Sequence, residues 1–270
     1  MRNRSTHPLF RAERRSTHGG RHELGQNFLI HRPTIRGIVD LVAATGGPIL
    51  EIGAGDGALT APLATLGRDL TAIDIDEHRV RKLQQRLPTV RVERADALQH
   101  PLDHPVLVGN VPYHLTTPIL RRLLARSGWR HAILLTQWEV ARKRAGVGGA
   151  TMMTAQSAPW FEFALHGRVP ARHFRPMPSV DGGILSITRR ASPLVDPRHR
   201  RPYDRFVRDM FTAAGRNLTV ILQRSGGLSR GTARMVLRDL GVADDALPRD
   251  LRPAQWAALW KEVSGRDGSG

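Results

Sequence analysis

The sequence predicts an α/β fold, a doubly wound and mostly parallel sheet followed by a small C-terminal helical domain. Between about residues 24 and 190, short apolar segments alternate with segments of helical periodicity, as in strands joined by crossover helices. After residue 190, apolar residues recur at helical spacing only. We therefore expect a basic arm over residues 1–22, the sheet domain over 23–190 and the helical domain over 191–270.

Five short apolar segments are the expected parallel strands: 48–52, 70–74, 90–92, 106–109 and 132–135. Helical spacing between them predicts crossover helices, for example at 77–86 and 118–126. Two later apolar segments, 161–169 and 183–188, predict an antiparallel hairpin at one edge of the sheet. A linker rich in proline and arginine precedes three further helical segments: 203–211, 228–240 and 253–263.

The charge balance predicts a polyanionic partner. Lys and Arg total 41 against 24 Asp and Glu, which gives a net charge of +17 over 270 residues. All but Lys82, Lys143 and Lys261 of these cations are arginines, whose planar forks suit phosphate and stack on bases. The segment 1–22 holds six arginines and one acid, Glu13. Nucleic acid is therefore the expected partner, rather than a membrane surface, and the helical domain over 191–270, where basic residues outnumber acids, is expected to bind RNA.

The absence of cysteine excludes disulfides and thiolate chemistry, including thiolate metal sites. We expect no bound metal. No apolar run has the length needed to span a bilayer, and the first 22 residues lack the apolar core of a signal peptide. These features predict a cytoplasmic protein without a membrane association.

A glycine-rich segment, 51–57 (EIGAGDG), follows the first predicted strand of the sheet. Gly53 and Gly55 would let the backbone turn tightly and approach a ligand closely, although an ordinary strand-to-helix turn has the same composition. Asp74 ends the next strand, 21 residues after Gly53. An acid at that place accepts hydrogen bonds from ribose hydroxyls in nucleotide-binding sheets, and a solvated strand-end acid is the alternative.

Two more acids bear on the nature of the ligand. Asp56 lies inside the glycine segment, where its charge would oppose a pyrophosphate, so a cationic ligand without phosphates fits better. S-adenosylmethionine is such a ligand. Asp96 ends the third strand and could accept a hydrogen bond from an adenine amine of that cofactor. It could equally cap the turn that begins at Ala97 and Leu98.

The segment 110–113 (NVPY) follows the fourth strand, where ligands of such sheets bind. An exocyclic adenine amine is a poor nucleophile because its lone pair is delocalised into the ring. The Asn110 side-chain oxygen and a backbone carbonyl near Pro112 would accept its two N–H bonds and localise that lone pair. Tyr113 offers a face on which an extruded base can stack. The alternative is a turn with a packed tyrosine.

Together these motifs resemble the rRNA adenine N6-methyltransferases, the family that includes the Erm resistance enzymes and the KsgA/Dim-type small-subunit dimethyladenosine transferases. The resemblance covers residues 24–190 strongly and the helical tail weakly. It rests on five motifs in order: 25–29 (GQNFL), 51–55 with Asp74, Asp96, 110–113 and 174–181 (FRPMPSVD). It implies a Rossmann-like methyltransferase domain.

The resemblance implies roles for individual residues. The residues implied to bind S-adenosylmethionine are Gln26, Asn27, Leu29, Gly53, Gly55, Asp74, Asp96 and Asn110. Asp74 stands where many relatives carry Glu, so the reach to the ribose differs. The residues implied to hold the target adenine are Asn110, Pro112, Tyr113 and Phe174, of which Phe174 would close over the second face of the base.

Two segments favour the Erm branch. Residues 142–151 (RKRAGVGGAT) resemble the Erm loop and lack the Pro-Gly-Ser-Lys-x-Tyr pattern of the KsgA branch. Residues 158–163 (APWFEF) resemble Erm proteins of actinobacteria. The expected partner is then 23S rRNA, bound by a monomer, and the expected outcome is resistance to macrolide, lincosamide and streptogramin B antibiotics. The alternatives are a 16S rRNA dimethyladenosine transferase, a non-catalytic rRNA-binding factor on this fold and a DNA adenine methyltransferase.

Overall fold

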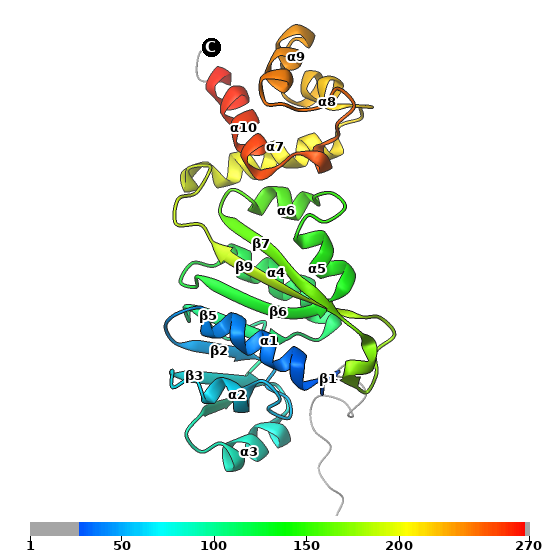
Figure 1. Ribbon diagram of the computed structural model, residues 1–270. Helices are drawn as coiled ribbons and strands as arrows, with labels where there is room; N and C mark the ends of the chain where they lie inside the picture. The colour runs from blue at the N-terminus through cyan, green and yellow to red at the C-terminus, as the bar shows by residue number, and fades with distance from the viewer. Residues whose placement is uncertain (1–26, 268–270) are drawn as a thin grey trace, which may run out of the picture.

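The computed structural model describes residues 27–267. The basic arm 1–22 and Gln26 lie outside the described residues. Seven strands form one sheet in the order β4-β3-β2-β5-β6-β9-β7 (Figure 1). Their bounds are β2 Ile49–Ile52, β3 Leu70–Asp74, β4 Arg91–Arg94, β5 Val106–Asn110, β6 His131–Gln137, β7 Phe161–Val169 and β9 Gly182–Arg189.

The five strands β2 to β6 are parallel to one another, and β9 runs antiparallel between β6 and β7. The predicted doubly wound sheet and its antiparallel edge hairpin are thereby confirmed. The bounds of β3 and β7 match the predicted segments, as do those of α3 Glu77–Arg86. The carboxyl ends of the parallel strands share one edge of the sheet, and this edge carries the candidate site.

Alternating strand residues contact helices on opposite faces of the sheet. Ile49, Val106 and Val108 belong to a cluster with residues of α1 Arg32–Ala43, α2 Thr60–Ala64 and α3. Leu50 and Leu107 belong to a second cluster, which includes the apolar residues of α4 Thr116–Ala125. Strands buried on both faces explain why these segments read as continuous apolar runs in the sequence.

The C-terminal region is helical, as predicted, and lies beyond the β7 edge and α6 Met152–Ser157 (Figure 1). Its helices are α7 Arg200–Thr212, α8 Leu218–Ser225, α9 Arg230–Asp239 and α10 Pro253–Asp267. The second cluster continues into these helices without a break. Tyr203 of α7 is fully buried, and its ring packs edge-on against Trp160 with the ring centroids 5.4 Å apart. Its hydroxyl donates to the Ala155 carbonyl at 3.1 Å.

A second, two-stranded sheet joins distant parts of the chain. β1 Phe28–Leu29 pairs antiparallel with β8 Phe174–Arg175, so that Leu29 lies opposite Phe174. The sequence analysis assigned no strand to either segment, because two residues show no periodicity. The pairing fixes the N-terminal motif beside the edge of the sheet that holds the glycine segment. Over residues 27–267, no helix is long and apolar enough to cross a membrane.

Candidate active site

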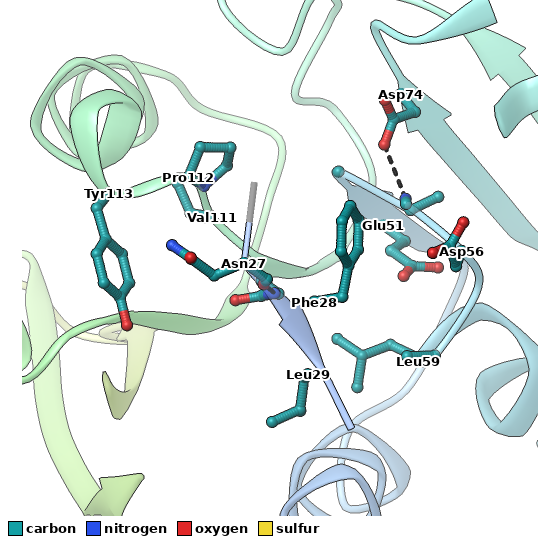
Figure 2. Close-up of a pocket in the computed structure, with 15 residues that line it drawn as sticks. Asn27, Phe28, Leu29, Glu51, Asp56, Leu59, Asp74, Val111, Pro112 and Tyr113 are labelled. Atoms are coloured by element: carbon teal, nitrogen blue, oxygen red, sulfur yellow. Dashed lines mark hydrogen bonds between the residues drawn. The ribbon is translucent and has the colours of Figure 1, made fainter. Parts of the chain in front are cut away.

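A pocket lies at the carboxyl ends of β2, β3 and β5, with an empty space of about 560 Å³. Figure 2 shows Pro112 and Tyr113 at one end, the acids Glu51, Asp56 and Asp74 at the other, and Phe28 between them. The other lining residues are Asn27, Leu29, Gly53, Ala54, Gly55, Ala58, Leu59, Asn110 and Val111.

The glycine segment turns through backbone conformations that favour glycine. Gly53 has φ 75° and Gly55 has φ 55°. A Cβ on Gly55 would lie 3.1 Å from the ring of Phe28, so the glycine also makes room for that side chain. The guanidinium of Arg79 lies 4.2 Å from the centre of the same ring. The backbone of the loop therefore approaches the pocket closely, as the sequence predicted.

Asp74 is held rigidly at the end of β3. Its side chain accepts the Gly55 N–H at 2.7 Å and the Asp76 N–H at 2.9 Å, and the residue is 4% exposed. Burial raises the pKa of the Asp74 carboxyl, and these two backbone hydrogen bonds act in the opposite direction. Each carboxylate oxygen can accept more than one hydrogen bond, so the side chain can still receive a ligand hydroxyl.

Two other acids line the pocket. Glu51 is 1% exposed, its Oε2 has no hydrogen-bond partner, and burial raises its pKa to about 8. The sequence analysis included Glu51 in the glycine-rich segment but assigned it no role. An acid inside an otherwise apolar strand was the feature of the sequence that could have identified it. Asp56 is half exposed and forms an ion pair with Arg79.

The pairing of Asp56 with Arg79 corrects one step of the sequence argument, which treated Asp56 as an uncompensated charge in the loop. The preference for a cationic ligand rests better on the pocket as a whole. Among the described residues that line it, three are acids and none is Lys or Arg. A ligand with a positive centre fits such a lining.

Asn110 ends β5, and its side-chain Nδ2 donates to the Asn27 carbonyl at 2.6 Å. This bond orients the amide and leaves Oδ1 to accept from a ligand. The Val111 N–H donates to the Leu135 carbonyl at 3.0 Å, which fixes the segment onto β6. Tyr113 begins a 3-10 turn, and its buried Oη has no partner. Burial, with a smaller effect of Asp181, raises the pKa of Tyr113 to about 12.

The structure thus gathers eight of the predicted site residues in one pocket: Asn27, Leu29, Gly53, Gly55, Asp74, Asn110, Pro112 and Tyr113. Two others do not line it. Asp96 accepts the Leu98 N–H at 2.8 Å, so the turn-capping alternative is observed. Phe174 is 3% exposed and lies beside Gly182. The proposed roles of Asp96, Phe174 and Gln26 stay predictions.

The fold and this pocket define a Rossmann-like methyltransferase. The family model described as ribosomal RNA adenine dimethylase matches residues 17–264, and the chain belongs to this family. The resemblance found in the motifs is thereby confirmed.

Several relatives share most of their length with this chain. Mycinamicin-resistance protein MyrB of Micromonospora griseorubida is 49% identical over 90% of this chain and 79% of its own. An rRNA adenine N-6-methyltransferase of Corynebacterium diphtheriae is 51% identical over 77% and 83%. The crystal structure of the 23S rRNA methyltransferase ErmE has a TM-score of 0.80 and 34% identity, covering 88% of this chain and all of its own. Ribosomal RNA small subunit methyltransferase A of Chlorobium limicola is 33% identical over 80% and 86%.

Proposed function

We propose that this chain transfers methyl groups from S-adenosylmethionine to the N6 amine of an adenine in 23S rRNA. The observation that carries the proposal is the geometry of Asn110. Its amide is anchored by the Asn27 carbonyl at the end of β5, and it lines a pocket that also holds three acids. The TM-score of 0.80 to the 23S rRNA methyltransferase ErmE and the 49% identity to a mycinamicin-resistance protein support the 23S target, while the cited small-subunit relative is 33% identical.

The residues of the pocket fit S-adenosylmethionine, which supplies an electrophilic methyl group when bound. Asp74 would accept the ribose hydroxyls, and the glycine backbone at Gly53 and Gly55 would lie against the cofactor. The described lining holds three acids and neither Lys nor Arg, so a sulfonium cation meets no like charge at this end of the pocket. Glu51 has an unpartnered oxygen in the pocket lining, so it can accept from a cationic group without breaking an existing bond.

The residues of the NVPY segment would act on the amine. Asn110 Oδ1 and a carbonyl near Pro112 would accept the two N–H bonds of the adenine, which concentrates the lone pair on nitrogen. Tyr113 would stack on the extruded base. A base is not needed before attack, since the amine becomes acidic only once it is methylated. The Asn110 amide is already oriented by Asn27, so little reorganisation accompanies the reaction.

Methylation of separated RNAs tests the proposal directly. The purified chain is incubated with labelled S-adenosylmethionine and protein-free 23S rRNA, 16S rRNA or duplex DNA, and the modified base is mapped. Label in an adenine of 23S rRNA is the expected result. Label confined to 16S rRNA would establish the small-subunit alternative, label in DNA alone would establish a DNA adenine methyltransferase, and cofactor binding without any transfer would indicate a non-catalytic factor.

A cellular test examines the consequence of the modification. A methyl group on that amine removes a hydrogen-bond donor and adds bulk where three antibiotic classes would press against the base. Expression in a sensitive bacterium should raise resistance to macrolides, lincosamides and streptogramin B compounds together, and Asn110→Ala should abolish it. A response to small-subunit drugs of the kasugamycin type instead would contradict the 23S assignment.

A further inference from the structure

A second pocket lies where the β7 edge of the sheet meets the C-terminal helices, with an empty space of about 1110 Å³. Its walls come from the segment after α5 Trp138–Arg144, from α6, from the start of β7 and from the start of α10. We call it the junction pocket. It shares no lining residue with the candidate active site. Whatever occupies it is therefore distinct from the cofactor and the target adenine.

The lining of the junction pocket is rich in guanidinium groups. Phe161 and Trp256 also line it, but each is only 1% exposed and is stacked on a core ring, so neither offers a free face to an occupant. Four arginines line the same pocket: Arg144, Arg190, Arg249 and Arg252. Guanidinium groups of this kind suit single-stranded nucleic acid, because their forks bind phosphate and their planes stack on bases.

The charges in the junction pocket do not cancel. Glu162 accepts from Arg190 at 2.6 Å, and Asp250 lies 3.9 Å from the Arg249 Nε. Within the described part of the chain, Arg144 and Arg252 form no ion pair with a carboxylate. Two acids against four arginines leave a net positive pocket, which calls for an anionic occupant.

Two buried donors also lack acceptors. The Arg144 Nη1 donates to Thr151 Oγ1 at 2.6 Å, but its Nε is buried without a partner. The indole Nε1 of Trp256 is likewise buried and unpartnered. Both groups can only donate, so an occupant that satisfies them must present acceptors. Phosphate oxygens and the carbonyl and ring nitrogens of bases are such acceptors.

We propose that the junction pocket binds a single-stranded nucleotide of the RNA substrate, remote from the target adenine. The inference rests on the proposed function, because it takes the occupant from the same RNA. It gives the C-terminal helices a defined task. They complete a site whose other wall belongs to the sheet, so the RNA contacts both regions at once.

A pair of double variants with equal loss of charge tests the inference. Arg249→Ala/Arg252→Ala removes two exposed arginines from the junction pocket. Arg230→Ala/Arg234→Ala removes two exposed arginines from α9 that do not line it. Filter binding of protein-free 23S rRNA should show a dissociation constant about tenfold higher for the pocket variant than for the α9 control. Equal dissociation constants of the two variants for RNA would overturn the inference.

Two further measurements separate this inference from the proposed function. Affinity for S-adenosylmethionine and the methylation rate at saturating RNA should stay at the wild-type level in both variants. If wild-type protein methylates no 23S rRNA, the proposed function fails. If the wild type methylates 23S rRNA and the two double variants bind RNA equally well, only the inference about the junction pocket fails. RNA substituted with 4-thiouridine should crosslink to segments 144–163 or 249–256, and crosslinks confined to other segments would contradict the site.

A free nucleotide presents the same phosphate and base acceptors to the junction pocket as a nucleotide of RNA. Adenosine 5′-monophosphate titrated into wild-type chain should bind no tighter than about millimolar, because one nucleotide lacks the neighbouring contacts of the RNA chain. Micromolar binding that is lost in Arg249→Ala/Arg252→Ala, with RNA affinity unchanged, would overturn the assignment to RNA in favour of a free nucleotide.

Discussion

The active-site pocket and the junction pocket have linings of opposite charge character. The described lining of the active-site pocket holds three acids and neither Lys nor Arg, while that of the junction pocket holds four arginines and two acids. A chain of net charge +17 thus keeps one acidic cavity within a basic surface. The net charge of the chain therefore predicts its polyanionic partner, whereas the residues that line the active-site pocket predict a small ligand with a positive centre.

The pockets also differ in how their charged groups are held. Asp74 is buried and fixed by two backbone N–H groups, whereas Arg249 and Arg252 are exposed. Substitutions in the active site should therefore alter specific steps by large factors. Those in the junction pocket should change RNA affinity alone.

Asn110→Ala should separate chemistry from binding. In the proposed mechanism its oxygen accepts from the amine as the amine attacks, so the loss should fall on kcat, by about 10²- to 10³-fold as for a lost oxyanion donor. Single-turnover methylation and filter binding measure the two quantities on the same RNA. RNA affinity should change little and serves as the internal control. A wild-type kcat would remove Asn110 from the mechanism.

Asp74→Ala should weaken S-adenosylmethionine by several-fold to about 100-fold, since a charge-assisted hydrogen bond contributes roughly 1.5–3 kcal/mol. Calorimetric titration gives the affinity. Asp74→Glu is the matched variant, because it retains the acceptor at a longer reach. RNA binding should be unchanged in both. An unaltered cofactor affinity in Asp74→Ala would mean that the ribose lies elsewhere.

Tyr113→Ala should remove a stacking surface of about 1–3 kcal/mol, observed as weaker productive RNA binding. Tyr113→Phe should retain nearly all activity, because the Oη makes no hydrogen bond in the described structure. Methylation rates across RNA concentrations compare the two variants. Equal losses in both would show that the hydroxyl, rather than the ring, is the functional group.

Glu51 predicts a pH dependence of stability. Burial raises its pKa from 4.5 to about 8, so the folded chain holds a proton that the unfolded chain releases. The contribution of this proton to the free energy of unfolding is complete below pH 4.5. It is lost as the pH rises toward 8, by about 1.4 kcal/mol per pH unit at most. Denaturant unfolding at pH 5 to 8 should show wild type losing stability relative to Glu51→Gln. Parallel curves would mean that Glu51 ionises normally.

Much of the sheet could be predicted because its segments are local and periodic. The bounds of β3 and α3 follow from apolar and helical spacing alone. The α8 helix was not predicted, since its eight residues lie between glycine-containing segments. The β1–β8 pairing joins residues about 146 positions apart, and nothing local to either segment encodes it.

The position of a pocket residue could be predicted where it follows from the end of a strand, as for Asp74 and Asn110. The environment of a residue could not be predicted where it depends on a partner that is distant in the sequence. The charge of Asp56 is met by Arg79, 23 residues later. The burial of Phe174 depends on strand pairing and on Gly182. In each case the missing information is tertiary.

The hydrophobic cluster that continues from the sheet into α7–α10 has a consequence for how the molecule melts. A shared interior couples the two regions, so heat should unfold them in one cooperative transition with matching calorimetric and van't Hoff enthalpies. A substitution of Tyr203 would then lower the fraction of folded enzyme, while each folded molecule keeps its full turnover. Loss of the C-terminal helices would leave an exposed apolar surface, and a cell would register it as aggregation or proteolysis.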